Sequence, residues 1–152
     1  MFGSNRAYKS SNNLRVDSKV HNYEITGQWH LEGVSDDGKY RHLYCDLVVK
    51  KENDDKPVAL LELLVTASSP TLEEHYEQVL RYAQQLCPLE VWVVHFSRED
   101  DVAKSPYWPR EEKRINVVHF WHDKDFSNVR MSYRTLDNSG GFKEVIDAQV
   151  LP

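Results

Sequence analysis

The amino-acid sequence predicts an α/β fold: a mixed β-sheet flanked by helices, with extra antiparallel strands. Three observations point to a sheet with helical cover. Apolar runs of strand length occur both early and late in the chain. Between them, one segment carries apolar residues at every third or fourth position, which is the period of an amphipathic helix. The order of strands, helix and further strands is typical of a sheet with a helix packed on it.

The length of the chain fits one domain with a buried core. We expect residues 1–13, which are polar, to form a disordered lead-in or an expression remnant, and residues 14–152 to fold. The net charge of −5 argues against a protein that coats nucleic acid through charge alone. It leaves room for an enzyme that brings divalent cations, because these offset carboxylates locally.

The hydropathy pattern bears on localisation. No apolar run approaches the roughly 20 residues that span a bilayer, so we expect no membrane partner. The polar N-terminus lacks the apolar core of a secretion signal. We therefore expect a site of action inside a cell, with the nucleus as one candidate compartment, or a domain taken from a longer protein that carries the targeting segment.

The first half of the chain predicts successive strands. Apolar residues alternate loosely over residues 14–31, which indicates one or two strands. Asp37 and Gly38 favour a tight hairpin turn, and residues 40–50 follow as a strand. After a turn at residues 53–57, residues 58–66 form a nearly continuous apolar run. Such a run is typical of a central strand that is covered on both faces.

The next segment predicts a helix. Thr71 is the expected N-cap, and Glu73 and Glu74 would lie in the first turn, where anions suit the helix dipole. Pro88 ends the pattern. The apolar positions with helical spacing are Leu72, Tyr76, Val79, Leu80, Ala83 and Leu86.

The second half of the chain predicts more strands, the last group antiparallel. The three runs are residues 90–96, 115–121 and 129–133. Residues 97–112 read as a polar loop. The tail, residues 135–152, has weak strand character and a turn at Ser139 to Gly141.

Two carboxylates interrupt the apolar strands in the first half. Asp46 and Glu62 lie within consecutive strand-like runs. A carboxylate in a buried strand is costly unless something pairs with it, and a divalent metal ion is a common partner. Two carboxylates and a backbone carbonyl can hold Mg²⁺. The alternative is that Asp46 ends a sheet edge and Glu62 forms an ion pair with Arg81 or a lysine.

The predicted helix adds polar groups to this pair. Gln78 and Tyr82 are four residues apart and share one helical face, and His75 lies one turn before Gln78 on nearly the same stripe. Beside two carboxylates, these side chains could orient water and a phosphate oxygen. The alternative is that Tyr82 is a core residue and Gln78 a surface residue.

Together, Asp46, Glu62 and the helix with Gln78 and Tyr82 resemble the PD-(D/E)XK restriction-endonuclease-like superfamily, particularly its RecB-like branch with a Gln-x-x-x-Tyr helix. The resemblance covers residues 43–132. It implies a core of one helix, three strands, a second helix and a fourth strand. It also implies hydrolysis of nucleic acid with Mg²⁺ or Mn²⁺ held by Asp46 and Glu62. Four stretches further resemble the C-terminal domains of crinkler-type effectors and related fungal proteins: residues 62–67, 72–76, 92–96 and 117–123.

The sequence departs from the superfamily pattern in two places. Leu64 occupies the position of the lysine that stabilises the phosphate charge and helps to activate water. Lys50 or Lys51, or Arg81 on the helix, could supply a displaced cation, although an arginine stays protonated and would act as a fixed charge. In addition, no long helix is predicted before the strands.

Basic and aromatic residues gather in the polar loop. Lys104, Trp108 and Arg110 lie there, and Arg81 is the basic residue of the helix. Basic residues interleaved with aromatic ones can bind single-stranded nucleic acid by stacking and phosphate contacts. The alternative is a solvated loop with Trp108 packed against the sheet.

Other site chemistry has weaker support. Cys45 and Cys87 lie in apolar surroundings without a C-x-x-C pair, which predicts two structural thiols. His119 and His122 suggest zinc, but residues three apart on a strand point to opposite faces, so we expect ordinary histidines. His95, near the end of a buried strand, is expected to be a hydrogen-bonded core residue. The sequence has neither a phosphate-binding glycine loop nor a serine nucleophile elbow.

The sequence therefore predicts a nuclease-fold effector domain that acts on nucleic acid, with DNA favoured, by metal-dependent phosphodiester hydrolysis if the site is active. One alternative is a degenerate, lysine-less nuclease fold that binds nucleic acid or a host protein without cutting. Another is a self-associating scaffold, with an apolar strand such as residues 117–121 at a homo-oligomer interface.

Overall fold

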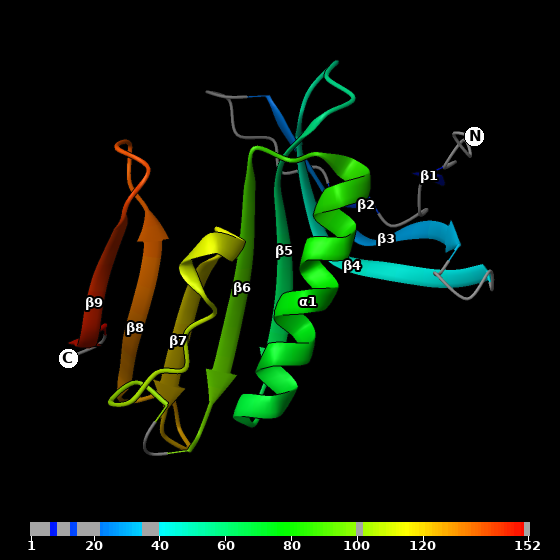
Figure 1. The fold of residues 1–152 in the computed structure, drawn as a ribbon. Helices are drawn as coiled ribbons and strands as arrows, with labels where there is room; N and C mark the ends of the chain where they lie inside the picture. The colour runs from blue at the N-terminus through cyan, green and yellow to red at the C-terminus, as the bar shows by residue number, and fades with distance from the viewer. Residues whose placement is uncertain (1–6, 9–12, 15–21, 35–39, 100–101, 151–152) are drawn as a thin grey trace.

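The computed structural model describes residues 7–8, 13–14, 22–34, 40–99 and 102–150. These residues form a nine-stranded mixed sheet, one α-helix and one short 3₁₀ helix, η1, so the predicted α/β class is confirmed (Figure 1). The helices are α1 (Ser69–Leu86) and η1 (Glu111–Lys113). The strands are β1 (Ala7–Tyr8), β2 (Asn13–Leu14), β3 (Tyr23–Val34), β4 (Tyr40–Lys51), β5 (Pro57–Val65), β6 (Glu90–Ser97), β7 (Asn116–His122), β8 (Val129–Leu136) and β9 (Phe142–Gln149).

The sheet combines an antiparallel, a parallel and a second antiparallel part. Strands β3, β4 and β5 are antiparallel neighbours, β5, β6 and β7 are parallel, and β7, β8 and β9 are antiparallel again. Helix α1 supplies the crossover that parallel strands β5 and β6 require. The tail is a full strand, β9, rather than a weak one, because it pairs with β8 along nearly its whole length.

Helix α1 begins earlier than the sequence predicts. The N-cap is Ser68, whose hydroxyl accepts a hydrogen bond from the Thr71 N–H, so Thr71 as N-cap is wrong. Pro70 explains the difference, because proline fits the first turn of a helix and fixes its backbone there. Glu73 and Glu74 consequently lie beyond the first turn. At the other end, Cys87 takes a left-handed conformation and its N–H bonds to the carbonyl of Ala83.

The core lies between α1 and one face of the sheet. Tyr76 and Tyr82 of the helix are fully buried against apolar residues of β4, β5 and β6, such as Leu60. The η1 segment is defined as residues 102–115, which contain η1. Figure 1 shows α1 and η1 on the same side of the sheet. On β5, Leu63 is 41% exposed and Val65 is 78% exposed. The prediction that this strand is covered on both faces is therefore wrong for its C-terminal half, within the described part of the chain.

The two cysteines, the predicted turn and the membrane prediction can also be compared with the structure. Cys45 is buried as expected, but Cys87 is exposed, because it caps the helix at the surface. The predicted turn at Asp37 and Gly38 lies outside the described residues, while its flanking strands β3 and β4 pair as a hairpin requires. Strands β1 and β2 pair with β3. In the described regions, no helix combines the length and hydrophobicity that a membrane crossing needs.

Candidate functional site

Asp46 and Glu62 converge where β4 separates from β5. The two strands pair as far as Leu47 and Leu61, and the recorded pairing stops there. Beyond this point, the backbone N–H of Leu63 in β5 donates to the side chain of Asp46 in β4, with 2.7 Å between N and Oδ2. The Asp46 side chain thus accepts a hydrogen bond where a backbone carbonyl of β4 would otherwise accept it. This places Asp46 beside Glu62. Its charge is close enough to raise the pKa of Glu62.

Glu62 is a buried carboxyl group with one engaged oxygen and one orphaned oxygen. The residue is 4% exposed. Its Oε1 lies 3.0 Å from Nδ1 of His75, whereas its Oε2 is buried and has no hydrogen-bond partner among the described residues. Burial and then the charge of Asp46 raise the pKa of Glu62 to about 8. A second partner that carries positive charge would satisfy this group.

Helix α1 presents Tyr82 and Gln78 to the same place. The Gln78 amide donates to the Tyr82 hydroxyl oxygen, which leaves the tyrosine proton free to donate elsewhere. Burial is the main cause that raises the pKa of Tyr82 to about 12, and Glu62 and Asp46 add to it. Tyr82 is therefore a protonated donor within electrostatic reach of both carboxylates. Tyr82 is a core residue, as the alternative prediction had it, and its hydroxyl faces the candidate site.

Cys45 belongs to this site, although sequence reasoning missed it. Its thiol points to the carbonyl oxygens of Leu47 at 3.5 Å and Leu61 at 3.8 Å. Burial, followed by the charges of Glu62 and Asp46, raises the pKa of Cys45 to about 12, so the thiol stays neutral. Its position directly before Asp46 in a buried strand was the available signal.

The structure does not bring every predicted cation to the carboxylates. Leu64, at the position of the expected lysine, is 7% exposed and packs in the core. Lys50 lies four residues from Asp46 along β4, which is about 13 Å at the usual rise per residue. There it lines a different pocket of about 350 Å³ together with Lys51 and Glu24. The partner of Glu62 is His75 rather than Arg81.

The donor set can be tested for a metal ion. The orphaned Oε2 of Glu62 and the carboxylate of Asp46 are hard oxygen ligands of the type that Mg²⁺ and Mn²⁺ prefer. No group of three or more His, Cys, Asp or Glu side chains in the described residues is arranged to hold a metal. Two carboxylates are therefore the protein side chains that could contact an ion here, and a backbone carbonyl and water would have to supply its other ligands.

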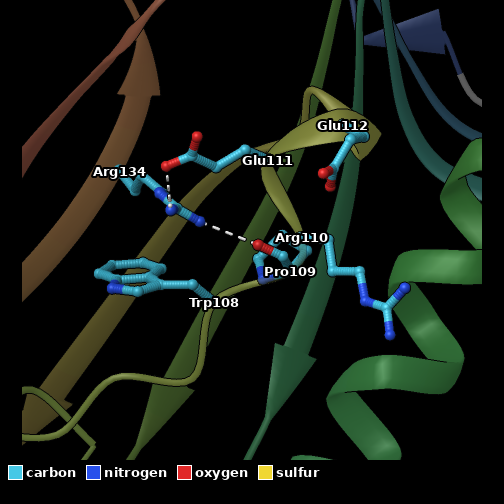
Figure 2. Close-up of a pocket in the computed structure, with 6 residues that line it drawn as sticks. All are labelled: Trp108, Pro109, Arg110, Glu111, Glu112 and Arg134. Carbon is cyan, nitrogen blue, oxygen red and sulfur yellow. Dashed lines mark hydrogen bonds and ion pairs between the residues drawn. The ribbon is translucent and has the colours of Figure 1, made fainter.

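The proposed nucleic-acid contacts lie in a second region, on the η1 segment. Lys104 and Arg110 are exposed, as is Arg81 on α1, while Trp108 is half-buried. The Trp108 ring packs 5.2 Å from the ring of His119, so the prediction of a tryptophan packed against the sheet describes its contacts. Figure 2 shows the pocket of about 550 Å³ at this segment, with Arg110 extended away from Arg134 toward α1.

Arg134 lines that pocket and is held by several contacts. Its guanidinium donates to the carbonyl of Pro109 and to Glu111, both at 2.9 Å (Figure 2). A further carboxylate, that of Glu144, lies 3.0 Å from its Nε. These contacts place carboxylates on Arg134, so that, among the described lining residues, the exposed Arg110 is the cation that can meet a ligand.

The histidines are arranged as the sequence suggests. His119 points into the core and His122 contacts the carbonyl of Asp123, so the two do not share a ligand position. His95 is a hydrogen-bonded core residue, with Nδ1 3.0 Å from Nδ1 of His119.

Comparisons with known proteins add no family assignment. No protein-family model matches this chain, and neither curated proteins nor solved structures yield a similar protein. The candidate site is therefore defined by its geometry, in which side chains of α1, namely His75, Gln78 and Tyr82, lie beside the two carboxylates of β4 and β5.

Proposed function

We propose that this domain acts on nucleic acid and hydrolyses phosphodiester bonds with the help of Mg²⁺ or Mn²⁺. The observation that carries the proposal is the convergence of Asp46 with Glu62, whose buried Oε2 has no hydrogen-bond partner among the described residues. A buried carboxyl group with a free oxygen beside a second carboxylate is a costly arrangement unless a cation completes it. A bound divalent cation would offset the cost of this buried carboxyl group.

We also propose that the sheet has the restriction-endonuclease-like architecture. In its support, β3, β4, β5, α1 and β6 follow one another in the order that the family resemblance implies after a first helix. The described residues contain no α-helix before β3. The same resemblance supports an effector role within a larger protein, with DNA as the favoured substrate. We propose an intracellular site of action, for which the nucleus is one candidate compartment.

The residues of the site have distinct roles in this proposal. The Leu63 N–H holds Asp46, and His75 holds Oε1 of Glu62, which leaves Oε2 for the ligand. A divalent cation bound there would polarise the phosphate and lower the pKa of the attacking water. Tyr82, which accepts the Gln78 amide, can donate its own proton to a phosphate oxygen. His75 is the nearest candidate to handle a proton in place of the missing lysine.

A cleavage assay tests this function. Purified domain is incubated with labelled single- and double-stranded DNA and with RNA, in Mg²⁺, in Mn²⁺ and with chelator. We expect metal-dependent cleavage that falls to the chelator level in Glu62→Ala and Asp46→Asn. Glu74→Ala, which changes an exposed glutamate of α1, is the matched control and should cleave normally. Cleavage that persists in Glu62→Ala would contradict the proposal.

A second function, binding without cleavage, is favoured by one observation: Leu64 packs in the core where the catalytic lysine is expected. In that case the domain would retain nucleic acid or a protein partner in the presence of chelator and cut nothing. Retention of nucleic acid should weaken as salt rises, because phosphate contacts release counterions. Arg110→Ala and Lys104→Ala should weaken it further, whereas Glu62→Ala should leave it unchanged.

A further inference from the structure

Two buried histidines face each other across neighbouring strands, outside the site described above. His95 of β6 and His119 of β7 are direct partners in the parallel register. They are 1% and 0% exposed, and their rings meet edge to face with centroids 5.2 Å apart. The two Nδ1 atoms are 3.0 Å apart, which is hydrogen-bond distance.

The neighbours of the pair determine where its protons lie. The backbone N–H of Ala67 points at His95 Nε2 from 2.9 Å, so this nitrogen must accept. Nε2 of His119 lies 2.9 Å from the carbonyl oxygen of Tyr107, so this nitrogen must carry a proton and donate it. With both rings neutral, His95 therefore carries its proton on Nδ1 and donates it to the bare Nδ1 of His119. Every ring nitrogen is satisfied with two protons in total.

This relay joins three parts of the fold. Ala67 lies at the junction between β5 and α1, and Tyr107 lies in the segment of residues 102–115. The same Tyr107 carbonyl also accepts the hydroxyl of Tyr76 from α1, at 2.8 Å, and the two tyrosine rings stack. The Tyr107 hydroxyl donates to Glu73. The histidine pair thus holds the 102–115 segment against the start of α1.

We propose that the His95 and His119 pair is an acid-sensitive latch between the β5–α1 junction and the 102–115 segment, which connects the two while both rings are neutral and opens when either ring takes up a proton. A third proton has only two places. On His95 Nε2 it would oppose the Ala67 N–H, and on His119 Nδ1 it would oppose the His95 Nδ1–H. Either position breaks one hydrogen bond of the relay.

The surroundings of the pair favour the neutral rings. Burial and then the neighbouring ring lower the pKa of His95 to about 4, and burial lowers the pKa of His119. On the β8 side, Arg134 lies over Trp108, which packs on His119. From α1, Glu73 is engaged by Lys113 and Tyr107. Among the described residues, Glu99 is the carboxylate that shares with both histidines the lining of a pocket of about 210 Å³.

Nuclear magnetic resonance of the intact chain tests the latch directly. Imidazole nitrogen shifts report the tautomers, and backbone amide signals report the 102–115 segment. At pH 7 we expect the Nδ1–H form for His95 and the Nε2–H form for His119. Between pH 7 and 3, the first protonation of the pair should have the same midpoint as the change in the amide signals of residues 102–115 and 67–72, while the amide signals of β8 and β9 persist.

Variants separate the latch from a merely structural pair. In His95→Gln with His119→Gln, each glutamine can donate and accept but cannot titrate, so the amide signals should stay unchanged over this range. His122→Gln, outside the pair, should behave as the wild type. The proposal is overturned if the segment moves at the same pH in the double variant, or if the wild-type rings protonate at a pH where the segment does not move. The second criterion needs the wild type alone.

Discussion

Glu62 shows how much one side chain can depend on its neighbours. Alone in a strand sequence, it indicates only a buried acid. In the fold it has one oxygen on His75, one oxygen without a hydrogen-bond partner among the described residues, and Asp46 close enough to raise its pKa. The same contacts that make it a ligand candidate make it a source of pH-dependent instability when no cation is present.

Glu62→Gln should make the metal-free domain less sensitive to alkaline pH. The pKa of Glu62 is raised from 4.5 in the unfolded chain to about 8, so the folded state binds more protons between these values. Folding therefore loses stability as pH rises from 4.5 to 8, by about 5 kcal/mol when complete. Urea midpoints at pH 5 and pH 8, with chelator, should differ less in Glu62→Gln than in the wild type.

The control for this prediction is Glu74→Gln, which removes an exposed carboxylate from α1. It should keep the wild-type pH dependence. If Glu62→Gln retains the full difference between pH 5 and pH 8, the destabilising carboxyl group lies elsewhere.

At the scale of elements, helix α1 illustrates which features of a sequence can be read locally. Its apolar positions Leu72, Tyr76 and Val79 follow the helical period, and all three are buried. The helix starts before the predicted N-cap, because Ser68 and Thr71 are both residues that favour this position and Pro70 fits the first turn that follows Ser68. The hydrogen bond from the Thr71 N–H to the Ser68 hydroxyl identifies Ser68 as the N-cap.

Ser68→Ala should destabilise the domain by about 1 kcal/mol, because the helix loses its N-cap acceptor. Chemical denaturation followed by circular dichroism measures this loss. Ser69→Ala is the matched control: it changes an exposed serine inside the helix, where alanine is favourable. Equal loss in both variants would mean that the cap is not at Ser68.

Strand β5 shows the limit of the same local reading. Its continuous apolar run predicts cover on both faces, yet Leu63 and Val65 are exposed. An apolar run specifies a strand but not the number of layers around it, since that depends on where α1 and the η1 segment pack.

Strand β7 bears on the prediction of a self-associating scaffold, because both of its edges are hydrogen-bonded, one to β6 and the other to β8. Its pairing edges are therefore not available to a second copy.

At the scale of the whole molecule, one arginine links the second half of the sheet to the η1 segment. Arg134 of β8 donates to Pro109 and Glu111, contacts Glu144 of β9, and lies over the rings of Trp108 and Phe142. No short sequence motif predicts that Arg134 joins these parts of the fold. This role arises because strands that are distant in sequence place their side chains under a shared segment.

Arg134→Met should lower the free energy of unfolding by about 2 kcal/mol, since the buried Pro109 carbonyl loses its donor. Arg134→Lys should recover only part of this loss, because a point charge cannot reproduce the forked contacts of the guanidinium group. Thermal unfolding is a suitable measurement, with Arg81→Met, at an exposed position of α1, as the control. A full rescue by lysine would show that charge alone matters at this position.

The sequence by itself determined the α/β class, most of the strands, the amphipathic helix and the placement of Asp46 and Glu62 on consecutive strands. These follow from local period, turn residues and the pairing of consecutive strands. Only the tertiary structure decided that Asp46 ends the pairing of β4 with β5, that His75 rather than Arg81 contacts Glu62, and that Lys50 lies far along β4. It also decided the proton positions of His95 and His119. The physical reason is that a side chain's partner, burial and charge state depend on atoms brought close by packing, which spacing along the chain does not encode.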